Sequence, residues 1–249
     1  MNWRVVELEQ HDAFTNMAID EAVSEAVAKG ASLPTIRFYT WKPSAVSIGY
    51  FQSLADEVDV ANCRMAGVDW VRRRTGGGAV YHDELGEITY SIIAPESTFP
   101  KGIIDSYQVI CGWIIDALDM LDIKAEFKPI NDITVNGKKI SGNAQTRRGG
   151  VLLQHGTILY DVDVKKMYSL LKVGKDKMAD KLIAAVEERV TSLKREKPEA
   201  AREELFEALK RCFVSGKPHT VGKWTDAELA RAKELAETRY RSKEWNEMR

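Results

Sequence analysis

The sequence is poor in cysteine and carries no excess of charge of either sign. Its three cysteines, Cys63, Cys111 and Cys212, lie far apart and form no CxxC pair, which argues against a zinc knuckle or a disulfide framework. The 36 lysines and arginines nearly balance the 37 aspartates and glutamates, so the net charge is −1. We therefore expect neither nucleic acid nor an anionic membrane as a partner.

Long hydrophobic runs are also missing from the 249 residues. The longest apolar stretch, residues 109–121, is broken by Asp116 and Asp119 and is too short to cross a bilayer. The first residues, MNWRVVE, lack the apolar core and cleavage site of a secretory signal. With 44% hydrophobic residues, the composition is that of a folded globular protein of one large or two small domains. We expect a soluble protein of the reducing cytoplasm.

Local patterns predict mainly strands in the first two thirds of the chain. A first helix is expected to begin at Asn16, a good N-cap, and to end at Gly30. A second helix is expected over residues 106–121, where apolar side chains recur at helical spacing and should face the core. Short β-like runs separated by proline and glycine are predicted at residues 35–40, 45–49, 69–74 and 88–94.

Residues 132–160 predict a three-stranded antiparallel meander. Asn136-Gly137 suits a two-residue type I′ turn, because both residues tolerate positive φ. A second reversal is expected at Gly149-Gly150, and the run that follows is rich in β-branched and aromatic side chains. Lys139 therefore lies on a strand just past a tight turn.

Beyond residue 163 the sequence predicts amphipathic helices. Asp163 supplies an N-cap signal, and Thr225 with Glu228 three positions later supplies a capping box. Lysine, glutamate and arginine alternate there with leucine, alanine and phenylalanine. We interpret these charges as the wet faces of packed helices.

Residue types suited to binding or catalysis concentrate first at residues 71–82 (VRRRTGGGAVYH), where three arginines precede three glycines. Consecutive glycines suggest that the backbone approaches a ligand closely or adopts backbone dihedral angles that other residues avoid. A phosphate is one such ligand, since glycine N–H groups and an arginine can bind an anion together. Strand alternation puts Arg73 opposite Arg72 and Arg74, so only one set can face a site. A flexible glycine turn with surface arginines is the alternative, and neither the P-loop nor the Rossmann fingerprint is present.

The second concentration is GKKISGNAQ at residues 137–145, followed by QHGT at 154–157. Small residues at positions 141, 142 and 144 leave a strand face open, so a ligand can lie against the backbone beneath a lysine ammonium. Such a cation suits a reaction in which negative charge builds on a phosphoryl oxygen or a carboxylate. Two solvated lysines beside a hairpin turn are the ordinary alternative. His82 and His155 are candidate acid/base groups, although each taken singly is more often a structural histidine.

In their order and combination these segments resemble the lipoate protein ligases, within the wider group of lipoate and biotin protein ligases and octanoyl transferases. The likeness extends to NMAIDEA at 16–22 and to the stretch from Arg239 to Asn246, and so covers essentially the whole chain. The matching motifs are RRTGGGAVYHD at 73–83, ND at 131–132, KISGNAQ at 139–145 and HGTIL at 155–159.

The resemblance implies an α/β (α+β) fold with a mixed, largely antiparallel β-sheet flanked by helices, and one catalytic domain over residues 1–249. It implies a ligase that uses ATP and magnesium to join lipoate to AMP, and then passes the lipoyl group to a lysine of a lipoyl carrier domain. Such carriers are the acyltransferase subunit of a 2-oxoacid dehydrogenase and the glycine cleavage H protein.

The resemblance also implies roles for individual residues. Lys139 is expected to be catalytic, between the lipoate carboxylate and the α-phosphate, where its ammonium aligns two anions and stabilises the transition state. Asn131 or Asp132 is expected to orient the phosphates, with Asp132 a candidate magnesium ligand. The residues expected to bind lipoate or ATP are Arg73, Thr75, Gly76, Gly77, Gly78, Ala79, Val80, Tyr81, His82, Asn131, Asp132, Lys139, Ser141, Gly142, Ala144, His155 and Gly156.

Two departures from the family pattern shape this interpretation. Octanoyl transferases of the group carry the acyl group on a thiol near the KISG-type motif, whereas residues 129–132 read PIND, so adenylation is favoured. Many single-chain ligases continue into an accessory domain, and this chain ends soon after Trp245-Asn246, so a separate small accessory subunit is expected. The alternatives are an octanoyl or lipoyl transferase acting without ATP, and a noncatalytic lipoate-binding subunit.

Overall fold

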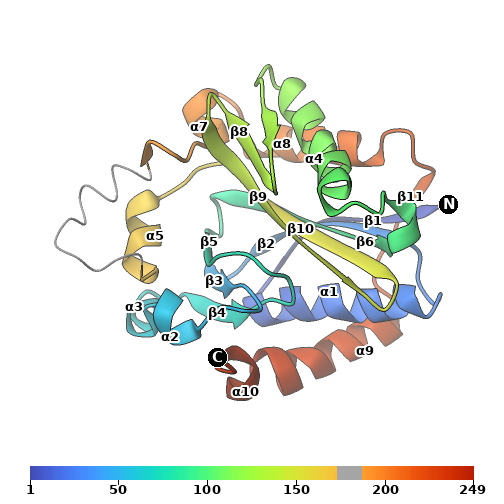
Figure 1. The fold of residues 1–249 in the computed structure, drawn as a ribbon, viewed down its shortest axis with the longest axis horizontal. Coiled ribbons are helices and arrows are strands. Elements are labelled where there is room, and N and C mark those ends of the chain that lie inside the picture. The colour runs from blue at the N-terminus through green and yellow to red at the C-terminus, as the bar shows by residue number, and fades with distance from the viewer. Residues whose placement is uncertain (173–186) are drawn as a thin grey trace.

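The computed structural model describes residues 1–172 and 187–249, and a mixed eight-stranded sheet lies at its centre (Figure 1). The strand order is β11-β1-β2-β6-β10-β9-β8-β7. β1 is parallel to both β2 and β11, and the other neighbours are antiparallel, so the predicted fold class is confirmed. The strands are β1 (Trp3–His11), β2 (Thr35–Trp41), β6 (Glu87–Pro95), β7 (Glu126–Lys128), β8 (Asp132–Val135), β9 (Lys138–Arg148), β10 (Val151–Leu159) and β11 (His219–Val221).

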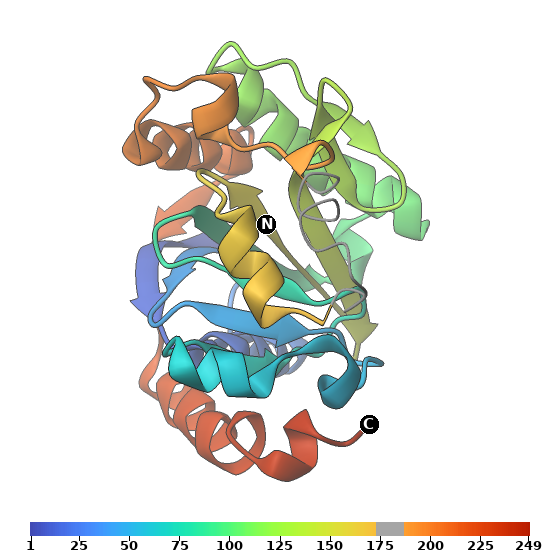
Figure 2. The ribbon, with the colours of Figure 1, turned by 90° about the vertical axis from the view of Figure 1, so that its left-hand side faces the viewer.

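A second, smaller sheet has three strands. β3 (Ala45–Ile48) lies in its middle, parallel to β4 (Asp69–Arg72) and antiparallel to β5 (Val80–His82). Side chains of this sheet, among them Val46 and Ile48, form a separate small core with α2 (Leu54–Glu57), α3 (Val60–Met65) and α5 (Val164–Leu170). Figure 2 shows α5 in front of the two sheets, with α2 and α3 below it.

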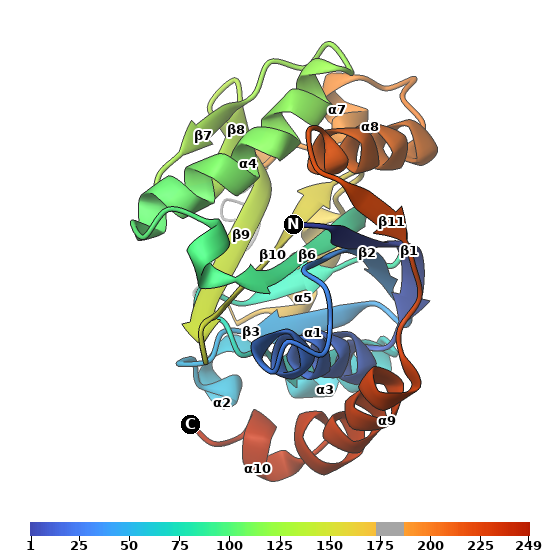
Figure 3. The ribbon, with the colours of Figure 1, turned by 90° about the vertical axis from the view of Figure 1, so that its right-hand side faces the viewer.

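Helices cover both faces of the large sheet (Figure 3). α4 (Ile103–Asp119) and α8 (Arg202–Val214) pack on one face, whereas α1 (Ala13–Ala28) packs on the other with α9 (Asp226–Leu235) outside it. None of the helices in the described part of the chain is both long and apolar enough to cross a membrane. Among the described residues, further short helices are η1 (Glu96–Thr98), α7 (Leu193–Glu196), η2 (Ala236–Tyr240) and α10 (Lys243–Asn246).

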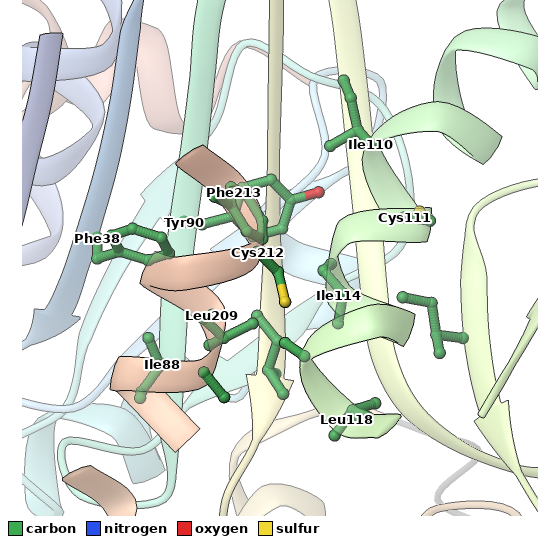
Figure 4. Close-up of a cluster of buried hydrophobic side chains, with 14 of the residues drawn as sticks. Phe38, Ile88, Tyr90, Ile110, Cys111, Ile114, Leu118, Leu209, Cys212 and Phe213 are labelled. Atoms are coloured by element: carbon green, nitrogen blue, oxygen red, sulfur yellow. The ribbon is translucent and has the colours of Figure 1, made fainter. Parts of the chain in front are cut away.

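The main hydrophobic core lies between the large sheet and the pair α4 and α8 (Figure 4). Phe38 and Tyr90 of the sheet meet Phe213 of α8 edge to face, with ring centroids 5.2 and 4.9 Å apart. Ile110 and Ile114 of α4 are fully buried against the same cluster. The apolar stripe predicted over residues 106–121 therefore faces the core, although α4 begins three residues earlier.

The start of the first helix differs from the prediction. Asp12, not Asn16, is the N-cap, and its side chain accepts a hydrogen bond from the Thr15 N–H. Asn16 lies one turn inside α1 and is fully buried, where its amide donates to the carbonyls of His11 and Thr40. The predicted end is confirmed, since α1 stops before Gly30, whose φ is +68°.

The predicted meander is confirmed, and so are the predicted caps at Asp163 and Thr225. Asn136 and Gly137 have φ of 51° and 77° between β8 and β9, and the reversal at Gly149-Gly150 also uses positive φ. Asp163 caps α5, and the capping box of Thr225 and Glu228 begins α9. The sequence patterns did not predict β1, whose two parallel partners are distant in the chain.

Candidate active site

A cavity of about 290 Å³ lies between the two sheets. Its volume is close to the lower end of the range, about 300–1,000 Å³, that is typical of small-molecule pockets. The large sheet, the small sheet and α1 all contribute to its wall. The predicted residues on the wall are Arg73, Gly77, Gly78, Ala79, Val80, Tyr81, His82, Asn131, Lys139, Gly142, Ala144, His155 and Gly156.

Strand register aligns four residues of the cavity wall in one row with Asp132. Tyr39 pairs with Thr89, Thr89 with Thr157, Thr157 with Gly142, and Gly142 with Asp132. Directly paired residues project from the same face of a sheet, so these five form one row across four strand boundaries. Gly142 leaves a gap without a side chain in this row.

A β-bulge turns Lys139 toward the same face as Gly142. Ile133 opposes Ser141, but Thr134 opposes Lys139, so one extra residue is inserted in β9. Bulges re-aim side chains in this way, because the extra residue changes the alternation along the strand. The Lys139 side chain consequently lies over Gly142, where an added Cβ would be 2.8 Å from Nζ. The ammonium thus lies above bare backbone at the cavity wall.

Backbone and side-chain contacts hold Lys139 in this position. Its N–H donates to the carbonyl of Arg189 at 2.7 Å, and its carbonyl accepts from the N–H of Thr191 at 2.8 Å. Its Nζ is 2.6 Å from Oδ1 of Asp132. The carboxylate gives the lysine a fixed counter-ion at the edge of the cavity.

The structure places Asn131 and Asp132 differently from each other. Asn131 lines the cavity and is bonded to Asn143, whose Nδ2 donates to the Asn131 carbonyl at 2.9 Å. Asp132 does not line the cavity and is paired with Lys139. Within residues 1–172 and 187–249, no three histidine, cysteine, aspartate or glutamate side chains are grouped to hold a metal ion. The Asp132 carboxylate is thus already paired with a cation, the Lys139 ammonium.

Arg73 lies beneath the glycine loop and donates to the loop itself. Its Nη2 bonds the carbonyls of Gly76 and Gly78, both at 2.8 Å, and its Nη1 bonds the carbonyl of Ser47 at 3.1 Å. Burial lowers the pKa of the Arg73 guanidinium to about 10, so the group stays charged at neutral pH. The loop is also fitted closely from below, because a Cβ on Gly49 would be 2.0 Å from the carbonyl oxygen of residue 77.

The neighbouring arginines point away from the cavity, as strand alternation predicted. Arg72 is fully buried and donates to the carbonyls of residues 49, 50 and 52 and to the carbonyl of Asn246. Arg74 forms an ion pair with Glu21, with Nη1 3.3 Å from Oε1. Both side chains therefore tie the loop to other elements.

His82 is held at one ring face and at both ring nitrogens. Its ring stacks on Trp41 with centroids 4.0 Å apart. Nδ1 is 2.8 Å from Oε1 of Glu87, and Nε2 is 2.8 Å from Oγ of Ser47. Ser47 and Glu87 also line the cavity, and sequence reasoning missed both.

His155 belongs to a buried hydrogen-bond chain. Its Nε2 is 2.7 Å from Oγ1 of Thr75, and its Nδ1 is 3.2 Å from Oδ2 of Asp20, which also pairs with Arg37 at 2.9 Å. Burial lowers the pKa of His155 more than Asp20 raises it, so the ring is neutral at neutral pH. Burial raises the pKa of Asp20, but the hydrogen bond of His155 and the charge of Arg37 outweigh it and keep the pKa below its usual value. The neutral ring donates from Nδ1 and accepts at Nε2.

Some predicted residues are not on the cavity wall. Thr75, Gly76, Asp132 and Ser141 do not line it. Ser141 faces the main core instead, because it pairs with Ile133 and Ile158. Side chains two residues apart on a strand face the same side of the sheet. This alternation could have predicted that Tyr39 and Trp41 of β2 lie on the same wall. The residues missed by sequence reasoning include Met17, Tyr39, Trp41, Ser47, Glu87, Thr89, Asn143, Thr157, Leu159 and Met167.

The three cysteines are buried away from the cavity, and none lines its wall in the described part of the chain. Burial raises the pKa of the Cys63 thiol to about 11 and that of Cys111 to about 12. Burial also raises the pKa of Cys212. Because the thiolate is the nucleophilic form, these environments suppress the reactivity of all three.

Comparison with known proteins identifies relatives over the full length of the chain. The family of the lipoyl protein ligase A/B catalytic domain matches residues 12–214. Octanoyltransferase LipM of Brevibacillus brevis is 34% identical over 98% of each chain, and that of Clostridioides difficile is 35% identical over 99% of each.

Solved structures of lipoate protein ligases have the same fold. A bipartite lipoate protein ligase of Thermoplasma acidophilum superposes with a TM-score of 0.88 at 30% identity, covering 99% of this chain and 96% of the other. A lipoate-protein ligase A bound with ATP gives a TM-score of 0.85 at 28% identity, covering 99% and 98%.

The full-length relatives overturn the expectation of an ATP-dependent lipoate ligase, because they are named octanoyltransferases. The roles of ATP and magnesium were expected only because of ligation, so nothing now supports them. The physical reason for the error is that a lysine near an acyl carbonyl and a glycine loop serve either reaction. A separate accessory subunit and a cytoplasmic location stay predictions.

Proposed function

Because the chain belongs to the family of lipoyl protein ligase A/B catalytic domains, we propose that it transfers an octanoyl group from a thioester carrier to a lysine of a lipoyl carrier domain, without ATP. The observation that carries this proposal is the likeness to octanoyltransferases across nearly the whole of both chains. A catalytic domain over residues 1–249 is part of the proposal, since both sheets line the same cavity.

The cavity suits an acyl chain that ends in a polar carbonyl. Met17, Trp41 and Ala144 give apolar surface along its wall, and Lys139 contributes a cation to the same wall. Apolar lining with a few placed polar groups is typical of small-molecule sites. An octanoyl chain can bury its methylenes against the apolar surface, which stabilises it by about 0.8 kcal/mol for each buried CH₂.

Lys139 is proposed to stabilise the transition state of acyl transfer. When a nucleophile adds to the acyl carbonyl, negative charge builds on the carbonyl oxygen. The Lys139 ammonium, fixed by Asp132 and by the backbone bonds of its strand, can donate to that oxygen without reorganising. A cation placed in advance costs little when the charge develops, and so lowers the barrier.

The acceptor in this proposal is a lysine of a lipoyl carrier domain. The solved Thermoplasma acidophilum ligase was described together with its E2 lipoyl domain, a carrier of this class. By this likeness we propose the lipoyl domain of a 2-oxoacid dehydrogenase acyltransferase, or the glycine cleavage H protein, as the acceptor.

Mass spectrometry of a lipoyl domain tests the proposal. The purified chain is incubated with octanoyl-coenzyme A and the lipoyl domain, with no nucleotide present, and in a parallel reaction with free octanoate and ATP. We expect octanoylation of one domain lysine in the first reaction. Octanoylation confined to the second reaction would overturn the proposed function.

A further inference from the structure

Three side chains in the cavity wall form a linear hydrogen-bonded series. Oγ of Ser47 on β3 is 2.8 Å from Nε2 of His82 on β5, and Nδ1 of His82 is 2.8 Å from Oε1 of Glu87 on β6. All three residues line the cavity, and each is more than nine-tenths buried. A hydroxyl, an imidazole and a carboxylate at these distances have the geometry of an activated nucleophile.

The surrounding contacts fix the direction of each proton in this series. Glu87 Oε1 accepts from the hydroxyl of Thr89 at 2.7 Å and from Nδ1 of His82, so Nδ1 carries the proton. Nε2 is then free to accept from the Ser47 hydroxyl. Nη1 of Arg73 donates to Ser47 Oγ at 3.1 Å, which leaves the hydroxyl proton directed at the imidazole. The tautomer therefore matches that of a general base beside a serine.

Two further features support a chemical role over a purely structural one. The second carboxylate oxygen of Glu87, Oε2, is buried and has no hydrogen-bond partner among the described residues. A buried carboxylate oxygen without a partner costs free energy, so its retention requires a reason. The negative charge of Glu87 gives one, because it stabilises the imidazolium that forms when His82 takes the serine proton.

None of the three cysteine thiols is placed to carry the acyl group. The three cysteines are buried outside the cavity and their thiols have raised pKa values. Ser47, by contrast, contacts the cavity and already has a base and an orienting carboxylate. The structure thus offers a hydroxyl where a transferase needs a nucleophile.

We propose that Ser47 is the nucleophile that carries the octanoyl group and that His82 is its general base. Glu87 orients the His82 ring and stabilises its protonated form. The inference rests on the proposed function, because it requires a thioester donor. Neither the family likeness nor the motifs identified this trio.

The reaction has two halves, acylation of Ser47 and transfer of the acyl group to the carrier lysine. In the first, Ser47 Oγ bonds to the thioester carbonyl carbon, the C–S bond breaks, and the serine proton passes through His82 Nε2 to the leaving thiolate. In the second, the neutral amine of the carrier lysine bonds to the ester carbon and the C–O bond to Ser47 breaks. The amine proton passes through Nε2 back to Ser47 Oγ.

Trapping the acyl-enzyme tests the inference directly. The full chain is incubated with octanoyl-coenzyme A without a lipoyl domain, digested, and analysed by mass spectrometry. We expect an octanoyl group on Ser47 that hydroxylamine at neutral pH leaves in place, since oxyesters react slowly. In Ser47→Cys the adduct should become a thioester that hydroxylamine removes, a change that a purely structural serine would not produce.

Matched variants separate chemistry from folding. Ser47→Ala should form no adduct and His82→Gln should slow adduct formation by about 10²–10⁴-fold, the contribution typical of a general base. Ser106→Ala, which removes another buried hydroxyl on α4, should form the adduct at the wild-type rate. Thermal unfolding of each variant identifies those that fail to fold, and Ser47→Cys keeps the side chain nearly isosteric.

The outcomes distinguish this inference from the function on which it rests. ATP-independent octanoyl transfer without any Ser47 adduct, with Ser47→Ala and Ser47→Cys as active as wild type, overturns the inference and leaves the proposed function standing. Absence of ATP-independent transfer by the wild-type chain overturns both.

Discussion

Lys139 takes its position from features of its immediate neighbourhood. The bulge at residue 140 turns it to the cavity face, Gly142 leaves space beneath its ammonium, and Asp132 lies 2.6 Å from Nζ. Each feature is local to the hairpin between β8 and β9. These features lie within residues 132–142, and the backbone of Lys139 is held in addition by Arg189 and Thr191.

Replacing Lys139 by alanine should slow octanoyl transfer by about a hundredfold to a thousandfold. Loss of one placed donor at a developing oxyanion typically has this effect. The transfer rate to a lipoyl domain measures it, with Lys138→Ala as the control, since that neighbouring lysine is exposed. Equal rates for the two variants would contradict the role of Lys139.

Replacing Gly142 by alanine should displace the ammonium without unfolding the protein. The new Cβ would lie 2.7 Å from Cε and 2.8 Å from Nζ of Lys139, so the flexible end of that side chain must move. An ångström-scale misplacement can cost about a hundredfold in rate, whereas the free energy of unfolding should change by less than about 1 kcal/mol.

Steady-state kinetics and urea unfolding of Gly142→Ala measure both effects. Gly112→Ala on α4 is the matched control, because an added Cβ there meets no atom within 4 Å. Unchanged transfer by Gly142→Ala would show that the ammonium position does not matter to the reaction.

At the scale of elements, one carboxylate joins the start of α9 to the edge of the sheet. Glu228 accepts from Arg4 of β1 at 2.6 and 2.7 Å, from the Thr225 N–H and from Ser32. Burial alone would raise the pKa of Glu228, but the Arg4 hydrogen bonds and the others outweigh it and lower the pKa to about 2. The capping box and the ion pair thus share one side chain.

The stability of the fold should depend on pH through Glu228. A carboxyl group with a lowered folded-state pKa contributes stability above its ordinary pKa of 4.5, and this contribution is lost as the pH falls toward about 2. The difference corresponds to about 3 kcal/mol for this well-buried group.

Urea unfolding of the wild type and of Glu228→Gln across this pH range tests the point. Glu228→Gln should be less stable near neutral pH, and its deficit should shrink as the pH falls below 4.5. Glu203→Gln, an exposed position on α8, is the control. A deficit that stays constant with pH would contradict the ionised role of Glu228.

Elements that depend on local signals were predictable, and those that depend on distant pairing were not. The Asn136-Gly137 turn and the stripe of α4 follow from backbone preference and side-chain period. Asn16 satisfies the local preference for an N-cap as well as Asp12 does. The choice between them is made by the buried Arg37, whose guanidinium bonds the carbonyl and side chain of Asn16.

At the scale of the whole molecule, the cavity exists because two sheets face each other. Motif residues such as Lys139 and Gly78 could be predicted, since each belongs to a compact segment. Ser47, Glu87 and Trp41 belong to no motif and reach the cavity only through the packing of the small sheet on the large one. These residues are brought together only by tertiary packing, so no pattern of residue spacing along the sequence predicts that they share a wall.

The whole-molecule likeness also decides between chemistries that the motifs leave open. Ligation and transfer both need a cation beside an acyl carbonyl, so Lys139 is compatible with either. Full-length similarity to octanoyltransferases favours transfer. In the proposed reaction the acyl group arrives already activated, and no nucleotide is consumed.

Counting pyrophosphate against octanoyl-lysine distinguishes ligation from transfer. The chain, a lipoyl domain, octanoyl-coenzyme A, free octanoate and ATP are mixed, and released pyrophosphate and free coenzyme A are measured together with the modified domain. We expect one free coenzyme A for each octanoyl-lysine and no pyrophosphate. One pyrophosphate for each octanoyl-lysine, with octanoyl-coenzyme A left intact, would contradict it.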